Sequence, residues 1–421
     1  MVNMDWTDSD EQKIFRNAVH DFIDNRLPDY YREKAKKPAG TALQADENGI
    51  QYHEDWQHDL ALGSDEAKKG AKEWAEALAE NGWSAPHWPK EYGGGGLSPM
   101  EQFIFKQELA LNGAPIVGGS GVAMLGPTLI HHGTEEQKKE FLPKTLNGDI
   151  LWAQGYSEPG AGSDLASLQT RAVKDGDNYI VNGQKIWTSQ GHKATWFFML
   201  VRTDPEAPKH RGITFVLVDT RGNGVEVRPL ISGGWEHATN ESFYTDVKIP
   251  VSRRVGEENR GWYVGMTLLD YERSNITGAV DLKKEIQGLI NYLGTDEGKL
   301  KSTVADRESV KSKIVDHYIE AEVLNNFALR IISMQAADQI PNYEASTSKV
   351  FGVTTLQQLQ QTGMKTFGLY AQIWDSLSKW APMDARFTQN SMHYAARSIS
   401  GGSNEIQRNI IATRGLGLPR G

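Results

Sequence analysis

The hydrophobic pattern of this 421-residue chain changes twice, near residue 151 and again near residue 261. Before the first change and after the second, apolar residues recur at helical spacing. Between them lie short β-branched and aromatic runs, separated by turn signals such as Asn182-Gly183. Helices, then strands, then helices is a segregated order, unlike the alternation of a doubly wound sheet. The sequence therefore predicts an α+β chain with an α-helical domain at 1–150, a β domain at 151–255 and a helical domain at 256–421.

The helical period and its capping signals locate the individual helices. Thr7 or Ser9 can cap the first one, and Thr134 with Gln137 has the spacing of a capping box. The stretch 28–63 is charged, punctuated by Pro and Gly and weakly periodic, so we expect a long loop there. The expected helices are 5–27, 64–81, 99–112 and 134–147, followed by 262–293, 307–338, 342–377 and 384–398.

Composition excludes several classes of function. The net charge of −9 argues against nucleic acid or an anionic membrane as the main partner, and the absence of cysteine excludes disulfides and thiolate metal sites. No run of about 18 apolar residues occurs, so no membrane span is expected. The first residues are acidic and polar rather than signal-like, which makes the cytoplasm the expected location. His131 and His132 are adjacent and cannot share one helix face, so they are expected to be structural and not to bind metal.

Two short motifs carry chemical information. Residues Tyr156–Asp164 read YSEPGAGSD, and their proline and glycines force a loop. Such a loop lets N–H groups and small hydroxyls approach a planar, acceptor-rich ligand. Residues Gly183–Ser189 read GQKIWTS and present an indole beside two hydroxyls, which suits stacking and edge bonding of a large aromatic ring. Taken singly, each motif is also typical of an ordinary surface loop or hairpin.

Together with the C-terminal segment Ile399–Arg408 (ISGGSNEIQR), the two motifs resemble the acyl-CoA dehydrogenase family, over nearly the whole chain. The resemblance implies an N-terminal α domain, a middle antiparallel β domain and a C-terminal four-helix bundle, with FAD as the cofactor. It implies α,β-desaturation of an acyl-CoA thioester, in which FAD N5 takes the β-hydride and electron-transfer flavoprotein receives the electrons. A homotetramer is implied as well, with a heterotetramer left open. The residues implied to contact FAD are Gln154, Tyr156, Ser157, Gly162, Ser163, Trp187, Thr188, Ser189, Gly402, Ser403 and Glu405.

The resemblance places the catalytic base on an unexpected element. The glutamate that many members use falls on Gly401, which has no side chain. A second group of members, including the isovaleryl- and long-chain-type enzymes, keeps its base just before an arginine on the helix that passes the substrate. Glu272 occupies that position before Arg273. The alternative is an ordinary exposed Glu–Arg pair without a catalytic role. Because Gly401 has no side chain, Glu272 is favoured as the group that abstracts the α-proton. Substrate contacts are then expected from Ser163, Asp270, Arg273 and Gly401.

The glycine at the usual base position also bears on the substrate. The N–H of Gly401 is expected to stabilise the thioester oxygen, and its missing side chain leaves space beside the acyl chain. We therefore predict that branched or bulky acyl groups are accepted. The segments Arg408–Ala412 and Gly417–Arg420 resemble a bacterial branch that includes steroid and branched-chain degraders.

Two other functions stay open at this point. The first is a flavin-dependent oxidase or monooxygenase on the same fold, which need not keep the helix glutamate, so Glu272 disfavours it. The second is a non-catalytic partner subunit of a heteromeric acyl-CoA dehydrogenase. The family's R-x-x-F-G segment, which reaches the FAD of a neighbouring subunit, has no clean counterpart at 291–306, and this keeps the second alternative open.

Overall fold

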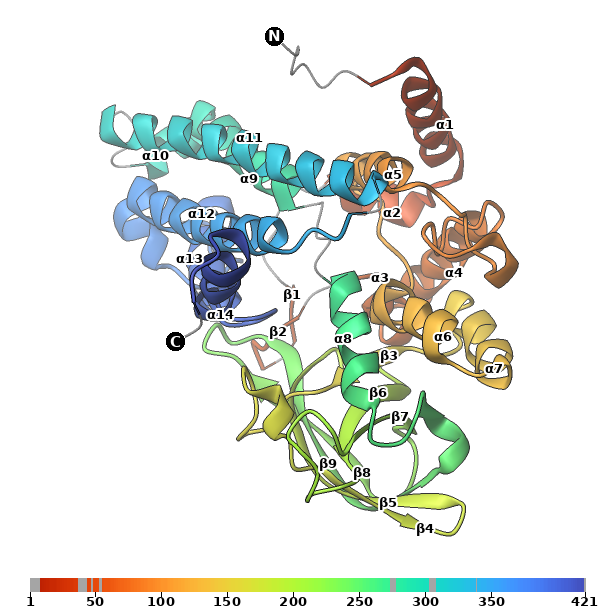
Figure 1. Cartoon of the computed structure of the whole chain (residues 1–421). Coiled ribbons are helices and arrows are strands. Elements are labelled where there is room, and N and C mark those ends of the chain that lie inside the picture. Colours follow the sequence, from red (N-terminus) through yellow and green to blue (C-terminus); the bar gives the residue numbers. More distant parts are fainter. Residues whose placement is uncertain are drawn as a thin grey trace.

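The computed structural model describes residues 8–36, 44–46, 48–52, 55–272, 278–302, 308–337 and 339–419, without the side chains of residues 44 and 270–272. Figure 1 shows a sheet at the bottom of the view, the N-terminal helices above it to the right and the long C-terminal helices at the upper left. The predicted α+β order of helices, strands and helices is confirmed.

Two of the N-terminal helices begin at capping residues that the sequence predicts, and the first of them starts at Asp10. Ser9 and Thr134 each form a capping box with the glutamine three residues later, Gln12 and Gln137. The first five of these helices share a core in which the indole N–H of Trp74 donates to the carbonyl of Pro115. The helices are α1 (Asp10–Arg26), α2 (Asp29–Lys36), α3 (Trp56–Ala61), α4 (Asp65–Ala79), α5 (Pro99–Asn112), α6 (Gly126–His132) and α7 (Glu135–Leu146).

The prediction of a long loop at 28–63 is wrong for the residues described there. α2 and α3 both lie in it, and β1 (Gln44–Ala45) pairs antiparallel with β2 (Gln51–Tyr52). With 8 and 6 residues, the two helices are too short for a helical period to stand out from the sequence. Asp59 of α3 accepts hydrogen bonds from Lys34 of α2, which joins the two helices into one packed unit.

The middle of the chain forms one mixed sheet with the order β10-β7-β6-β4-β5-β9-β8, and β3 joins it beside β6. Most neighbours run antiparallel as predicted, but β3 and β6 are parallel, and β4 touches β6 in parallel at one residue pair. Parallel pairing joins segments that need a long connection, so a local pattern does not reveal it. The strands are β3 (Trp152–Gly155), β4 (Arg171–Asp175), β5 (Asn178–Ser189), β6 (Trp196–Arg202), β7 (Ile213–Asp219), β8 (Val225–Ile231), β9 (His237–Pro250) and β10 (Arg254–Val255).

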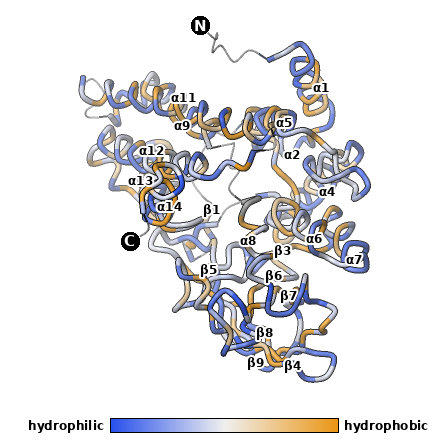
Figure 2. Tube along the Cα trace, viewed as in Figure 1, coloured by the Kyte–Doolittle hydropathy of each residue, from blue (hydrophilic) through white to orange (hydrophobic). Residues whose placement is uncertain are grey.

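The long C-terminal helices between residues 278 and 367 share a core that includes Ile286, Leu289 and Phe367. Figure 2 shows polar and apolar stretches alternating along α9 and α11. The helix predicted at 342–377 is shorter than expected, because the chain turns at Gly368, where φ is 56°. The helices are α8 (Gly261–Glu272), α9 (Gly278–Gly294), α10 (Asp296–Lys301), α11 (Glu308–Ala336), α12 (Tyr343–Phe367), α13 (Arg386–His393) and α14 (Asn404–Ile410).

The helix α8 connects the sheet to the N-terminal helices. Its first residue, Gly261, lies so close to β7 that a Cβ atom would come within 2.2 Å of the backbone nitrogen of Phe215. Further along, Thr267 Oγ1 lies 2.9 Å from a ring nitrogen of His132 on α6. None of the helices in the described part of the chain is long and apolar enough to cross a bilayer.

Candidate functional site

The loop Tyr156–Asp164 follows β3 and presents its tip to solvent. Glu158 and Ala161 exchange two backbone hydrogen bonds of 3.0 Å, which close the tip into a tight turn. A Cβ atom at Gly160 or Gly162 would meet no described atom within 4 Å. The loop therefore has a fixed tip and leaves free space around its glycine backbone, as a ligand cradle requires.

The predicted contact residues of this loop differ in exposure. Tyr156 is buried and packs edge-on against Phe215, whereas Ser163 is exposed beside the loop tip. Ser157 is half-buried, and its carbonyl accepts a hydrogen bond of 2.9 Å from the backbone N–H of Ile186 on β5. This bond brings the two sequence motifs side by side.

The strand β5 exposes the side chain of Trp187 to solvent. The pairing of β5 with β9 is irregular between Lys185 and Thr188, and Trp187 adopts a φ of 61°, which is rare for a bulky residue. The Trp187 side chain is 60% exposed. Ser189 is also exposed, whereas Thr188 is fully buried, so the two hydroxyls that the sequence grouped together lie on opposite sides of the strand. A strained, exposed indole beside a glycine loop offers a face for stacking.

A polar network supports Thr188 from behind. The side-chain amide of Asn240 donates to the carbonyl of Thr188 over 3.1 Å and lies 3.2 Å from Nδ1 of His192. Its oxygen lies 2.8 Å from Nε2 of His237. Burial, followed by the charges of His237 and Lys193, lowers the pKa of His192 to about 4. His192 is therefore neutral at pH 7 and accepts the amide hydrogen bond through Nδ1.

Two buried amide groups mark positions where a ligand edge could bind. Nε2 of Gln154 on β3 and Oε1 of Gln190 after β5 have no hydrogen-bond partner among the described residues. Buried polar atoms without a partner are rare in folded proteins. The glycine loop, the exposed indole of Trp187 and these unpaired amide atoms together fit a planar heteroaromatic group with hydrogen-bonding atoms along its edge.

The C-terminal segment forms a fixed turn just before α14. Gly401 and Gly402 have φ values of 62° and 80°, and the carbonyl of Gly401 accepts a hydrogen bond of 3.1 Å from Nε2 of Gln407. At Gly402 a Cβ atom would lie 2.6 Å from that same nitrogen. At Gly401, in contrast, no described atom lies within 4 Å of the position that a Cβ atom would take. The turn therefore leaves no room for a side chain at Gly402 but leaves free space at Gly401.

The remaining predicted residues of this segment make local contacts. Ser403 caps α14 and accepts a hydrogen bond of 3.3 Å from the backbone N–H of Ile406. Glu405 is exposed and lies 3.8 Å from Arg408. Contact of Ser403 or Glu405 with a ligand stays a prediction.

The C-terminal helices meet the sheet beside the Trp187 strand. The imidazole of His393 on α13 lies 2.9 Å from a carboxylate oxygen of Glu236 and 2.9 Å from Oε1 of Gln51. Glu236 directly precedes β9, whose first residues pair with Thr188 and Ser189. Figure 1 shows α13 and α14 above this end of the sheet, next to β2.

The helix α8 packs against Tyr156, the first residue of the loop. A Cβ atom at Gly265 would lie 3.3 Å from the hydroxyl oxygen of Tyr156, and Leu268 shares a buried cluster with that tyrosine. Glu272 is the last residue of α8, but its side chain and that of Asp270 lie outside the described side chains. Arg273 lies outside the described residues. The base and substrate roles of these three residues stay predictions.

Two functional candidates escaped the sequence analysis, although both lie inside its motifs. Lys185 is fully buried, and its Nζ lies 2.7 Å from a carboxylate oxygen of Glu158. The available signal was a single lysine within a strand motif that is otherwise apolar, aromatic or uncharged. A local pattern could not show that its partner lies in the loop.

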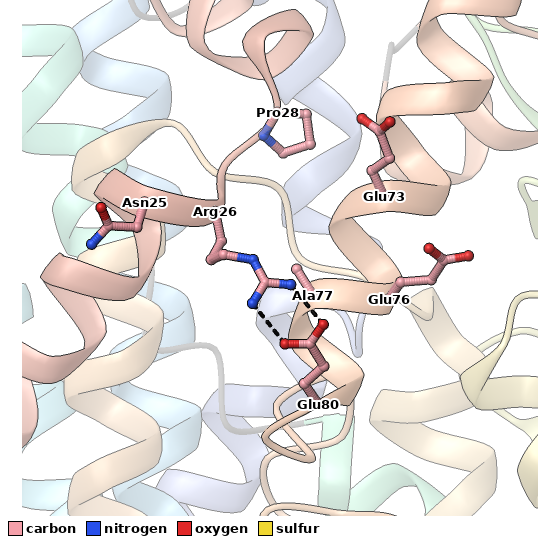
Figure 3. A pocket seen from close by; sticks show the side chains of 7 residues that line it. All are labelled: Asn25, Arg26, Pro28, Glu73, Glu76, Ala77 and Glu80. Carbon is pink, nitrogen blue, oxygen red and sulfur yellow. Dashed lines mark hydrogen bonds and ion pairs between the residues drawn. The ribbon is translucent and has the colours of Figure 1, made fainter.

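A separate hollow of about 300 Å³ lies on the surface where the end of α1 faces α4 (Figure 3). Arg26 and Glu80 bridge it through two hydrogen bonds of 2.6 Å. Glu73 and Glu76 add carboxylates along one side (Figure 3). Its lining includes no residue of the loop, of β5 or of the C-terminal turn, so it is distinct from the site described above.

Comparison with known proteins identifies relatives along the whole chain. Three family models match it, described as the acyl-CoA dehydrogenase N-terminal domain (45–149), middle domain (153–247) and C-terminal domain (259–416). A Mycobacterium tuberculosis protein named acyl-CoA dehydrogenase FadE26 is 37% identical over 349 residues, which cover 82% of this chain and 86% of that protein. A solved structure named "Tcur3481-Tcur3483 steroid ACAD" is 32% identical, with a TM-score of 0.79, and the match covers 99% of this chain and 100% of that one. The ChsE4-ChsE5 complex from Mycobacterium tuberculosis is also 32% identical, with a TM-score of 0.76 and the same coverage.

Proposed function

Because the chain belongs to the acyl-CoA dehydrogenase family, whose members are FAD-dependent oxidoreductases of lipid metabolism, we propose that it desaturates a bulky, ring-bearing acyl-CoA thioester with Glu272 as the base. The reaction would remove a proton from the carbon beside the thioester and a hydride from the next carbon.

The observation that carries this proposal is the open glycine at position 401. A side chain is missing where many family members have their base, and no described atom fills the space on that side of Gly401. A desaturase of this kind still needs a group that accepts the α-proton. Glu272, the last residue of α8, is our candidate for this group. The same helix packs against Tyr156, where the loop Tyr156–Asp164 begins.

The chain's own residues would supply position, polarisation and a base. Bound FAD supplies the acceptor for the hydride. Trp187 would cover one face of the flavin ring, and Nε2 of Gln154 would donate to an acceptor on its edge. The carboxylate of Glu272 would take the α-proton, and an apolar substrate beside it would exclude water from the site. The backbone N–H of Gly401 would stabilise negative charge that develops on the thioester oxygen.

Two further observations support a bulky acyl group. Gly401 leaves space beside the proposed position of the acyl chain. The similar solved structure is named a steroid ACAD, so a related protein of the same fold is associated with a polycyclic substrate class. A fused-ring acyl group needs width close to the thioester, and a glycine there provides it.

Electron transfer and assembly form part of the same proposal. Electron-transfer flavoprotein would reoxidise the enzyme, as it does for family members, and the cytoplasm is the proposed location. The exposed face of α11 carries an apolar stripe at helical spacing, consisting of Val315, Tyr318, Ile319 and Val323. Stripes of this kind often mark protein–protein contacts, which supports a tetramer. The name of each similar structure contains two protein names, and one of the two is named a complex. We therefore propose that a second, related subunit can take part in the tetramer.

The proposal is tested with a panel of acyl-CoA esters and an artificial electron acceptor. The full chain is assayed alone and together with candidate partner subunits, and its mass is measured by light scattering. We expect turnover of ring-bearing esters in preference to straight medium-length chains. A clear preference for straight chains would contradict the substrate class. Reduction followed by rapid reoxidation in air would instead indicate an oxidase, and bound flavin without turnover of any ester would indicate a partner subunit.

A further inference from the structure

We propose that the buried ion pair of Glu158 and Lys185 is a positioning device that holds the loop 156–164 against β5, and that it thereby sets how tightly FAD binds. This inference rests on the proposed contact of the flavin ring with that loop and with Trp187.

Glu158 ties the beginning of the loop to the residues that directly precede β4. One carboxylate oxygen accepts a hydrogen bond of 2.6 Å from the backbone N–H of Gln169, and the other accepts one of 2.9 Å from that of Thr170. Glu158 is only 8% exposed. A single side chain therefore closes the whole segment between these residues, and it does so with charge-assisted hydrogen bonds, which are stronger than neutral ones.

Lys185 ties the closed loop to the strand behind it. From β5, two residues before Trp187, its Nζ donates to Glu158 over 2.7 Å and to the carbonyl of Tyr156 over 3.1 Å. Lys185 is completely buried. The ammonium group thus links both predicted halves of the flavin site, the loop and the Trp187 strand, at one point.

Arg202 on β6 fixes the far side of the same segment. Its guanidinium donates to the carbonyl of Ala166 over 2.6 Å and to that of Leu168 over 3.3 Å. Between these anchors, the tip at Gly160 and Gly162 stays open. The anchors hold the backbone around the tip without occupying the space where a ligand would bind.

The electrostatics favour a positional role over a stabilising one. Burial raises the pKa of Glu158, but the charge of Lys185 and hydrogen bonds from Lys185, Thr170 and Gln169 outweigh it and lower that pKa overall. Burial also lowers the pKa of Lys185 to about 8, further than Glu158 can restore, and the charge of Arg202 adds to the shift. Both groups are charged at pH 7, but burial lowers the pKa of the lysine by more than Glu158 raises it. Buried pairs of this kind contribute little net stability, and specific positioning is a role for which they are retained.

Three variants of the full chain separate positioning from folding. Lys185→Met and Glu158→Gln each break the pair, and we expect FAD binding about 10- to 100-fold weaker, the change that corresponds to one lost hydrogen bond to a charged group. The double variant Glu158→Gln/Lys185→Met leaves no unpaired buried charge, so its melting temperature should return toward that of the wild type. Its FAD affinity should stay weak, and the backbone amides of residues 165–170 should exchange hydrogen faster than in the wild type.

The matched control is Lys209→Met. Lys209 pairs over 2.5 Å with Asp164 in the same loop, but both side chains are at least half exposed. This variant should bind FAD as the wild type does. A double variant that regains wild-type FAD affinity and amide protection would overturn the inference, because the pair would then be structural only. A wild-type chain that takes up no FAD would contradict the proposed flavin site. The amide exchange of the variants would still show whether the ion pair of Glu158 and Lys185 holds the loop in place.

Discussion

Replacing Gly401 with alanine tests whether the open side of the C-terminal turn faces the acyl group. Gly401 has a φ of 62°, and no described atom lies within 4 Å of the new Cβ position. The methyl group therefore meets no described neighbour in the free chain. Its effect on folding comes from the backbone alone, since a left-handed conformation costs an L-residue about 1–2 kcal/mol.

The effect on catalysis should be larger for some substrates than for others. If a bulky acyl group lies beside Gly401, the methyl group occupies space that the substrate needs. One methylene in an apolar pocket changes discrimination by about 1–3 kcal/mol, or roughly 10- to 200-fold in kcat/KM. We expect such a loss for ring-bearing esters and a smaller one for short straight chains, which can move aside.

Gly176→Ala provides the matched control. Gly176 lies in the turn between β4 and β5, has a φ of 57° and likewise has no described atom within 4 Å of a Cβ position. Both variants should lose a similar amount of thermal stability, measured by melting, but only Gly401→Ala should change the substrate profile, measured as kcat/KM across the ester panel. Equal profiles for the two variants would refute the assignment of Gly401 to the acyl site.

Three further predictions follow from single side chains. Trp187→Ala should weaken FAD binding several-fold to about tenfold through lost stacking, measured by flavin fluorescence, whereas Trp235→Ala, which removes a 56% exposed indole at the same φ of 61°, should not. Gly126→Ala should lower the melting temperature by several degrees, because its Cβ would lie 1.8 Å from Cζ2 of Trp88 and overpacking costs about 1–3 kcal/mol; an unchanged melting temperature would contradict this packing. Burial lowers the pKa of His87 to about 4, so the unfolded chain binds more protons than the folded one between about pH 4 and 6.5, and stability should fall as the pH drops through that window. A His87→Gln variant should lose part of that pH dependence in melting curves, and an identical dependence would argue against a buried neutral histidine.

The parts of the fold that depend on local signals were predictable from the sequence. Ser9 and Thr134 cap their helices as expected, and the Asp175-Gly176 and Asn223-Gly224 turns separate strands. The turn predicted at Asn182-Gly183 is wrong, because both residues lie inside β5, where the chain makes only an irregularity in the pairing with β9. The short helices α2 and α3 were missed, since their brief span shows no period. The helical periodicity continues past Gly368, but the helix ends there because Gly368 adopts a positive φ. Tertiary contacts as well as the flexibility of glycine determine that φ, so the sequence alone does not predict the end of the helix.

The candidate site was predictable as a set of motifs but not as an arrangement. The loop at Tyr156 and the strand at Trp187 lie side by side, joined by a backbone hydrogen bond between Ser157 and Ile186. The opposite orientation of Thr188 follows from the strand pleat and the irregular pairing beside it, which the sequence does not show. The pairing of Glu158 with Lys185 is likewise a product of the tertiary fold.

The central claim is that Glu272 is the base, and replacing it with glutamine tests this most directly. An amide cannot accept the α-proton, so Glu272→Gln should retain FAD and still bind an ester, seen as a change in the flavin spectrum, but lose about 100- to 10,000-fold in turnover. Glu257→Gln, at an exposed glutamate shortly before α8, serves as the control and should keep wild-type turnover. If Glu272→Gln holds its full complement of FAD and oxidises the same ester at the wild-type rate, the proton goes elsewhere and the proposed mechanism is wrong.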